Sequence, residues 1–398
     1  MSGACPNRWS PSSLAAGLLS CLVLSVEGCG APATNVAPSV RALLGSIATG
    51  EVPQFRIEAI RCSGQSHVTV SDLRQLLMES DHVDAATRAI KGLGADAAGT
   101  ESDLVRIAAD TRSPAARRLG ALTAIGAIGA LGMPLRAEVM AISKNRAEDS
   151  VIRAYATIAL VRTGDAPELL AQLMPDVNDP IADLMLAYEC FVQGPKSASA
   201  QDALLILSER YGSRTMEGRI ARLARLRILR WQGELLEWAV HEVTSNDGRI
   251  AAFLTNVDEP LPPEILTALR SLLKGEDRLG AVDAAVALIQ QTMQEDRTAL
   301  DAIVSDLRSP DELHHLVVKL VDLDVVVDVG QSKPLADAIR QMLASESASE
   351  RGNAICILLK TKPGEKWFLP DLKRCETDRD ASVQSLAKCA LRKISERQ

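Results

Sequence analysis

Hydrophobic side chains recur every three or four residues between Asp149 and Gly164, which is the spacing of one face of an α-helix. The small or apolar positions of this face are Ile152, Ala156, Ala159, Leu160 and Thr163. Asp149 stands one turn before Arg153, where a carboxylate can accept hydrogen bonds from the free N–H groups of a helix start. The stretch therefore predicts an amphipathic helix whose small residues let a second helix approach closely.

The same pattern recurs along most of the chain. Counted from Arg153 as position zero, small or apolar residues follow at plus three, plus six and plus seven. The other zero positions of this frame are Val83, Arg118, Leu184, Arg219, Arg249, Ala281, His315, Arg351 and Gln384, spaced 30 to 36 residues apart. The frame is weakest where Arg222, Arg225 and Thr255 take positions that are small or apolar elsewhere. Two short helices and two turns need a unit of this length.

A second amphipathic segment lies between successive frames. These segments are Ser102–Ala109, Leu135–Ile142, Pro167–Leu173, Gln201–Glu209, Glu234–His241, Pro263–Leu273, Ala299–Leu307, Leu335–Leu343 and Trp367–Cys375. Helix-start signals agree with the frame. Ser113, Asp179 and Ser309 each precede a proline as a capping residue, and Thr100 with Asp103 has the spacing of a capping box. Each unit is therefore predicted to be a helical hairpin.

Two stretches, SPAARRLGALTAIGAIG at 113–129 and DSVIRAYATIALVRTG at 149–164, resemble HEAT repeats, in particular the short HEAT-like repeats of phycobilisome lyases. The resemblance covers roughly residues 70–398. It implies an all-α fold, an α-solenoid of about nine to ten stacked two-helix repeats. It implies no catalytic residue, because similar repeats serve in lyase subunits, scaffolds and nucleic-acid enzymes, and a fold does not fix a function.

The N-terminus has the outline of a secretory signal. A polar start with Arg8 is followed by an apolar run, Leu14–Val26, and then by Gly28 and Cys29. The run is too short to span a hydrocarbon core of about 30 Å. It resembles a bacterial lipoprotein signal, in which Cys29 becomes the acylated N-terminus. The alternatives are an ordinary signal peptide cut near residue 31 or 33, and a cytoplasmic protein with a chance apolar start.

Composition favours one repeat array over several globular domains. Hydrophobic residues make up 47% of the 398 residues and aromatic residues only 3%, which suits helices packed through alanine, leucine and valine. The formal net charge is −7. A mildly acidic body argues against a nucleic-acid partner, whose phosphates need clustered lysine and arginine.

The sequence offers little catalytic chemistry. Beyond Cys29 there are five cysteines, namely Cys62, Cys190, Cys356, Cys375 and Cys389, which are interpreted as small buried residues. Neither they nor the five histidines have the spacing of a metal site or of a nucleophile motif, so no cofactor and no metal are expected. The arginine-rich stretch from Arg210 to Arg230 could hold an anion, but its spacing drifts around the helix and favours a solvated or ladder-forming surface.

The positions opposite the packed face carry the most informative pattern. At plus one, plus five and plus eight, the first and last repeats are mostly polar, as capping repeats require. The middle helices are apolar there, with Ala154, Ile158 and Val161 in one repeat. The candidate partner-binding residues at plus one and plus five are Ile250, Leu254, Val282, Val286, Leu316 and Leu320. Either curvature of the array buries them, or they line an apolar groove for a protein segment or acyl chain.

The sequence thus predicts a signal peptide at 1–28, a flexible linker at 29–40, an N-terminal capping segment at 41–69 and a repeat solenoid at 70–398. We expect an exported, lipid-anchored binding scaffold of the cell envelope that has a protein partner and no catalysis of its own. An exported enzyme or lyase-like subunit that uses the solenoid groove is the alternative, and a cytoplasmic nucleic-acid binder is the third.

Overall fold

The computed structural model describes residues 56, 58, 59 and 62 and residues 70–396, the latter with gaps at 79–81, 246–248, 293–298, 308, 324 and 361–364. All regular secondary structure in these ranges is helical. The described residues belong to two compact units. We call residues 66–239 the N-terminal unit, and residues 53–65 together with 240–398 the C-terminal unit.

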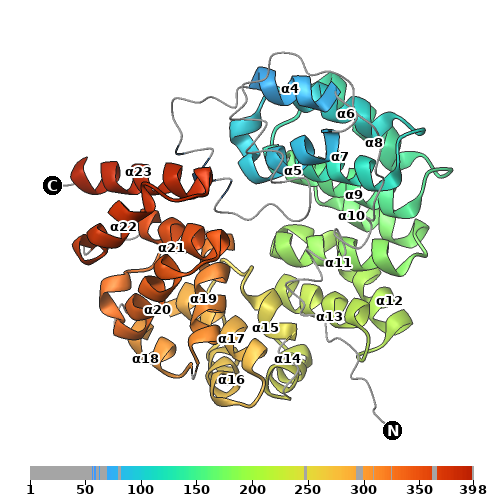
Figure 1. Cartoon of the computed structure of the whole chain (residues 1–398). Helices are drawn as coiled ribbons and strands as arrows, with labels where there is room; N and C mark the ends of the chain where they lie inside the picture. Colours follow the sequence, from blue (N-terminus) through green and yellow to red (C-terminus); the bar gives the residue numbers. More distant parts are fainter. Residues whose placement is uncertain are drawn as a thin grey trace, which may run out of the picture. The chain divides into compact units, whose positions relative to one another are not determined.

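The N-terminal unit consists of helical hairpins in two rows. Its helices are α4 (Val70–Met78), α5 (Val83–Leu93), α6 (Glu101–Ala109), α7 (Ala115–Ile128), α8 (Met133–Lys144), α9 (Ser150–Arg162), α10 (Glu168–Leu173), α11 (Pro180–Gln193), α12 (Gln201–Tyr211) and α13 (Met216–Ile228). Helices α5, α7, α9, α11 and α13 pack on one another in succession and form one row (Figure 1). Helices α4, α6 and α8 pack in succession in the second row, and α4, α6, α8, α10 and α12 each pair with a helix of the first row.

The C-terminal unit repeats this arrangement. After α14 (Glu234–Thr244), which crosses the boundary, its helices are α15 (Arg249–Leu254), α16 (Pro263–Lys274), α17 (Arg278–Thr292), α18 (Ala299–Ser305), α19 (Pro310–Asp322), α20 (Lys333–Ala344), α21 (Ala348–Lys360), α22 (Leu369–Cys375) and α23 (Ala381–Glu396). Helices α15, α17, α19, α21 and α23 form one row in succession. Helices α18, α20 and α22 form the other, while α16 pairs with α17 (Figure 1).

The repeat frame matches these helices throughout. The ten zero positions, from Val83 to Gln384, fall one each in α5, α7, α9, α11, α13, α15, α17, α19, α21 and α23. The nine intervening amphipathic segments coincide with α6, α8, α10, α12, α14, α16, α18, α20 and α22, the last with the short 3-10 turn Glu365–Phe368 before it. The helical hairpins are confirmed where the paired helices contact each other, including the unit in which Arg222 and Arg225 break the residue pattern.

Three of the expected caps are present. Asp149 accepts hydrogen bonds from the backbone N–H groups of two residues at the start of α9, and Asp179 does the same at α11. The Ser309 hydroxyl accepts one from the N–H of Glu312 at α19, 3.2 Å away. Each satisfies donors that a helix start otherwise leaves open.

Two expected caps are wrong. Helix α7 begins after Pro114, which has no side chain to cap it, and the Ser113 hydroxyl instead donates to Asp110 at 3.2 Å. Thr100 makes no side-chain bond to the start of α6. Asp103, its expected capping-box partner, binds Arg74 of the preceding hairpin at 2.8 Å. A contact between neighbouring repeats therefore replaces a local one.

The expected outer face of α9 is also wrong. Ala154, Ile158 and Val161 are only 0%, 5% and 6% exposed. Helix α9 packs against α7 and α11 in its own row and against α8 and α10 in the other row. A helix with neighbours on so many sides buries nearly its whole circumference, which is why its sequence is apolar all round.

Candidate functional site

Cys29, the expected lipid-carrying residue, lies outside the described residues, as do the signal peptide and the linker. No helix among the described residues combines the length and the hydrophobicity that a membrane crossing needs. No cluster of three or more metal-ligating side chains occurs among them either.

The six candidate partner-binding residues are all buried. Ile250 and Leu254 on α15, Val282 and Val286 on α17, and Leu316 and Leu320 on α19 are each 0% or 1% exposed. These helices are consecutive members of one row, so the structure does bring the six residues into one region. They belong to the interior, as the first of the two alternatives requires, and an apolar groove lined by them is not open in this structure.

Charged side chains connect one repeat to the next. The Arg118 guanidinium donates two hydrogen bonds to the Glu148 carboxylate, at 3.0 and 2.6 Å, and a third to the backbone oxygen of Ala108 at 2.7 Å. Arg351 binds Asp378 through two bonds of 2.6 and 2.7 Å in the same manner. Further pairs join side chains 27 to 36 residues apart and are Arg162–Glu189, Arg210–Asp183, Arg278–Glu312 and Lys319–Asp283.

These pairs account for most of the buried charge. Asp183, Glu189, Asp283 and Glu312 are each less than 9% exposed, and each faces a cation from another helix of its row or the adjoining row. Removing one partner of a buried pair leaves an uncompensated charge, so such pairs fix the register of neighbouring elements even where their net stabilisation is small. The buried ionic chemistry therefore holds the stack of hairpins together.

The zero position of the frame has a structural role that the sequence did not reveal. Arg118 and Arg153 are 4% and 6% exposed, although arginine is rarely buried. Each directs its Nε–H to a backbone oxygen ten residues earlier, Ala108 for Arg118 and Ser143 for Arg153. The buried guanidiniums therefore satisfy carbonyl groups at the end of the preceding helix. The only sequence signal was an arginine recurring at one place in the frame.

The arginine-rich stretch is also largely committed to structure. Arg227 donates to the backbone oxygen of Phe191 at 2.7 Å, and Arg210 donates to Asp183 at 2.9 Å. The Arg222 guanidinium lies 5.6 Å from the ring centre of Trp238, within the range of a cation–π interaction. The ladder-forming interpretation of this stretch fits these contacts better than an anion site does.

Asp183 is a buried carboxyl with a perturbed pKa. It is 1% exposed and accepts hydrogen bonds from Tyr211 Oη at 2.7 Å and from Arg210 at 2.9 Å, both on Oδ2. Its Oδ1 has no partner among the described residues. Burial raises the pKa of Asp183 despite these bonds, and burial together with the bond to Asp183 raises the pKa of Tyr211 to about 12. A carboxyl with a raised pKa is what an enzyme's acid would need.

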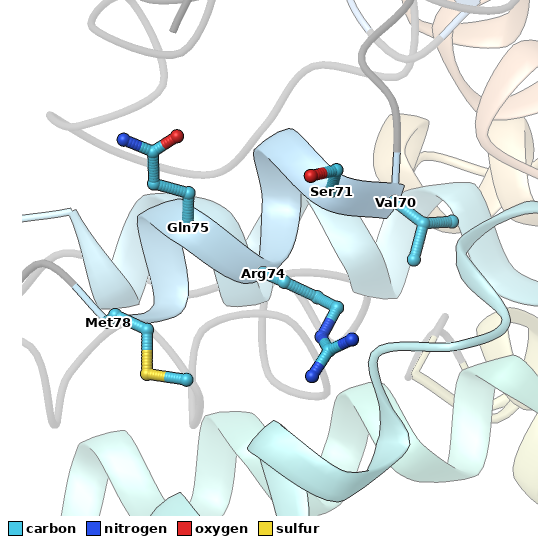
Figure 2. A pocket seen from close by; sticks show the side chains of 5 residues that line it. All are labelled: Val70, Ser71, Arg74, Gln75 and Met78. Atoms are coloured by element: carbon cyan, nitrogen blue, oxygen red, sulfur yellow. The ribbon is translucent and has the colours of Figure 1, made fainter. Parts of the chain in front are cut away.

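A shallow hollow lies over α4 and is lined by Val70, Ser71, Arg74, Gln75 and Met78. Figure 2 shows Arg74 and Met78 on one side of the helix and Ser71 and Gln75 on the other. The Met78 side chain is 57% exposed, and its sulfur accepts a hydrogen bond from Arg106 of α6 at 2.8 Å.

Beside this hollow, two arginines pair with the same carboxylate. Arg74 and Arg106 both pair with Asp103, at 2.8 and 3.6 Å, so that within this trio two guanidiniums share one carboxylate. The two arginine side chains are 50% and 57% exposed, whereas that of Asp103 is 6% exposed. We call Arg74, Met78 and Arg106 the α4 patch, an exposed surface that combines a flexible apolar side chain with positive charge. Sequence analysis missed it, because its members come from two different hairpins.

Comparison with known protein families and with curated protein sequences finds no match for this chain.

Proposed function

We propose that the chain is an α-solenoid of about nine to ten stacked two-helix HEAT-like repeats and that it works as a non-enzymatic binding scaffold. The observation that carries this proposal is the ladder of buried ion pairs between successive hairpins, typified by Arg118–Glu148 and Arg278–Glu312. Buried charge in this chain serves to hold one repeat on the next. Such an array is a rigid support whose exposed faces are free to vary and to bind.

The scaffold is exported and held at a membrane of the cell envelope by a lipid on Cys29. This part rests on the apolar run that ends at Gly28 and Cys29. Cys29→Ala removes the thiol that would carry the lipid. We expect the variant to leave the membrane fraction or to keep its signal peptide, whereas Cys62→Ala, a matched control, should fractionate like the wild type. Unchanged fractionation and unchanged mature mass of Cys29→Ala would disprove the anchor.

The partner is a protein segment that carries apolar and acidic side chains, and it binds at the α4 patch. Met78 supplies a flexible apolar contact of the kind used at adaptable binding surfaces. Arg74 and Arg106 supply the charge that attracts a carboxylate. The buried set on α15, α17 and α19 cannot offer such contacts without opening the core.

A capture experiment tests the scaffold and its surface together. Wild-type protein immobilised through its C-terminus is used to recover partners from solubilised membranes, which are identified by mass spectrometry. We expect Met78→Glu to lose the main partner, because a carboxylate at this place repels an acidic segment. Met133→Glu is the control, since Met133 is 75% exposed but lies on α8, outside the patch. Equal recovery by both variants would reject the α4 patch, and recovery of no protein by the wild type would reject the scaffold.

An exported enzyme or lyase-like subunit is the second candidate, favoured by Asp183 alone. The raised pKa of this carboxyl and its bond to Tyr211 fit a proton donor. Asp183→Asn preserves the shape but can neither donate nor accept the carboxyl proton, so an enzyme that used this group as its acid would lose turnover while partner capture stayed intact. The net charge of −7 continues to argue against a nucleic-acid binder.

A further inference from the structure

A short stretch near the N-terminus belongs to the C-terminal unit and lies against its last helix. Arg56, Glu58, Ala59 and Cys62 are helical and fall in the same compact unit as residues 240–398. The Arg56 guanidinium donates hydrogen bonds to Asp380 at 3.1 Å and to the Ser382 hydroxyl at 3.2 Å, at the start of α23. Ala59 is 1% exposed, so this stretch is packed as well as hydrogen-bonded.

Contacts at two levels align the stretch with α23. Arg56 reaches the start of that helix at Ser382, and farther along the helix the side chains of Cys62 and Cys389 lie within hydrogen-bond reach of each other.

Burial agrees with this alignment. Cys389 occupies plus five of the last repeat, which lies opposite the packed face of the frame. It is nevertheless only 4% exposed, whereas Cys62 remains half-buried. Solvent therefore reaches the Cys62 thiol but has little access to the Cys389 thiol.

We propose that Cys62 and Cys389 are a redox-active pair that closes to a disulfide and ties the N-terminal stretch to the last repeat. Cys356 is the competing partner for Cys389, because it has the same place in the preceding repeat. Helices stacked in a row lie about 8 to 10 Å apart, which exceeds the limit of about 7 Å between the Cα atoms of a disulfide. Cys62 is not a row neighbour of Cys389, and its side chain is in contact with that of Cys389.

The oxidant is a low-molecular-weight disulfide such as oxidised glutathione. Cys62, the accessible member, passes its proton to the Cys389 thiolate as it attacks one sulfur of the reagent, and the other reagent sulfur leaves as a thiolate. Cys389 gives this proton to the departing thiolate and then attacks the Cys62 sulfur of the mixed disulfide, which expels the second reagent thiolate. The two protein sulfurs are oxidised to one disulfide, one reagent disulfide is reduced to two thiols, and the second reagent thiolate takes its proton from water.

The surroundings suit Cys389 to the second step. The hydrogen bond from Cys62, together with the positive charges of Lys393 and Arg392, lowers the pKa of Cys389 to about 6 although burial opposes this. The same contact, together with burial, raises the pKa of Cys62. At neutral pH one proton is therefore held by Cys62, and Cys389 supplies the thiolate that resolves the mixed disulfide.

The test is equilibration of the reduced full chain with oxidised and reduced glutathione, followed by acid quenching and peptide mapping. We expect the main product to be one intramolecular cross-link between the peptides that contain Cys62 and Cys389. The oxidised chain should also unfold at a higher temperature than the reduced chain, because the cross-link restrains a very long stretch of the unfolded chain. Cys62→Ser should abolish both effects, and Cys356→Ser should leave both in place.

Cys62→Ser is the informative variant, because Cys62 is half-buried and serine is close to it in size. Its far-UV circular dichroism should match that of the wild type, even if Cys389→Ser fails to fold. Three outcomes would overturn the proposal: glutathione attached to Cys62 with no cross-link, a cross-link between Cys356 and Cys389, or thiols that all stay reduced at an oxidising glutathione ratio. None of them bears on whether the chain is a scaffold.

Discussion

The Arg118 guanidinium and the Glu148 carboxylate, 30 residues apart, meet through two hydrogen bonds of 3.0 and 2.6 Å. Their side chains are only 5% and 10% exposed. Two parallel bonds of this kind constrain both distance and angle, which a lysine in place of Arg118 would not do. Arg118 also reaches the Ala108 carbonyl, so a single side chain ties α7 to the end of the preceding helix and to the loop that leads into the next repeat.

Arg118→Ala should therefore destabilise the N-terminal unit strongly. Loss of one partner from a buried pair costs about 3 to 5 kcal/mol, because the other charge stays buried without compensation. Arg146→Ala is the control. Arg146 also binds a carboxylate one repeat away, Asp176 at 3.0 Å, but its side chain is 79% exposed. An exposed pair contributes about 0 to 1 kcal/mol. Urea unfolding followed by circular dichroism measures both, and similar losses for the two variants would contradict the structural role of burial.

Two isosteric changes in the ladder should have opposite effects at pH 7. The hydrogen bonds from Arg118 hold the pKa of Glu148 below its usual value of 4.5. The ionised Glu148 therefore stabilises the folded protein at neutral pH, and this stabilisation is lost as the pH falls through and below 4.5. Glu148→Gln should therefore destabilise the protein at pH 7 and make its stability depend less on acid pH.

Asp183 should have the opposite pH dependence. Burial raises its pKa above the usual value of 3.8, so the free energy of unfolding that this carboxyl contributes falls as the pH rises above 3.8.

Asp183→Asn removes a buried charge and keeps an oxygen that Tyr211 and Arg210 can still bind. We expect the variant to be at least as stable as the wild type at pH 7 and to lose the decline in stability between acidic and neutral pH. Thermal unfolding midpoints across pH 3 to 7 for the wild type and both variants provide the measurement. If Asp183→Asn is as damaging as Glu148→Gln at pH 7, burial does not dominate at Asp183.

Periodicity predicted the helices well, because apolar spacing within one helix is a local property. The helices from α5 to α23 were recoverable from the positions around residues such as Arg153 and Ala281. The period could not reveal which side of a helix meets solvent once a helix has neighbours all round, as Ala154 and Ile158 show. It was equally silent on the contact of Cys62 with Cys389 and on the α4 patch, because these depend on residues far apart in the chain.

The packing of α9 predicts that two alanines will be equally intolerant of size. Ala156, at a predicted packed position, and Ala154, at a predicted outer position, are both 0% exposed. Ala156→Leu and Ala154→Leu should each cost about 1 to 3 kcal/mol through overpacking. Ala137→Leu on α8 is the control, because Ala137 is exposed. Chemical denaturation that finds Ala154→Leu as harmless as Ala137→Leu would restore the helical phase that the sequence alone suggests.

The buried set in the C-terminal unit gives a related prediction. Leu254 is 1% exposed and Leu320 is 0% exposed, so a carboxylate at either place is buried without a partner. Leu254→Asp and Leu320→Asp should lose most of their thermal stability. Val326→Asp should not, because Val326 is 52% exposed in the same unit. If the two leucine variants stay folded and lose a partner, the apolar groove considered from the sequence exists in solution.

Backbone conformation after α13 supplies the last prediction. Arg230 and Trp231 have φ angles of 53° and 61°, in the left-handed region that residues with a Cβ rarely occupy. Trp231 is 6% exposed, and its N–H donates to the Leu226 carbonyl at 2.9 Å, so packing and a helix-end hydrogen bond hold this turn.

The Arg230 side chain is exposed, so a substitution there changes the backbone strain without removing a buried side chain. Glycine adopts this φ without steric cost, so Arg230→Gly should raise the free energy of unfolding by up to about 1 kcal/mol, the relief of strain exceeding the added freedom of the unfolded chain. Gln232→Gly is the matched control, because Gln232 is equally exposed but its φ is not positive, and there glycine should destabilise by about 0.5 to 1 kcal/mol. Differential scanning calorimetry of the two variants decides the matter. If both glycines lower the unfolding temperature alike, the left-handed turn at Arg230 stores no strain.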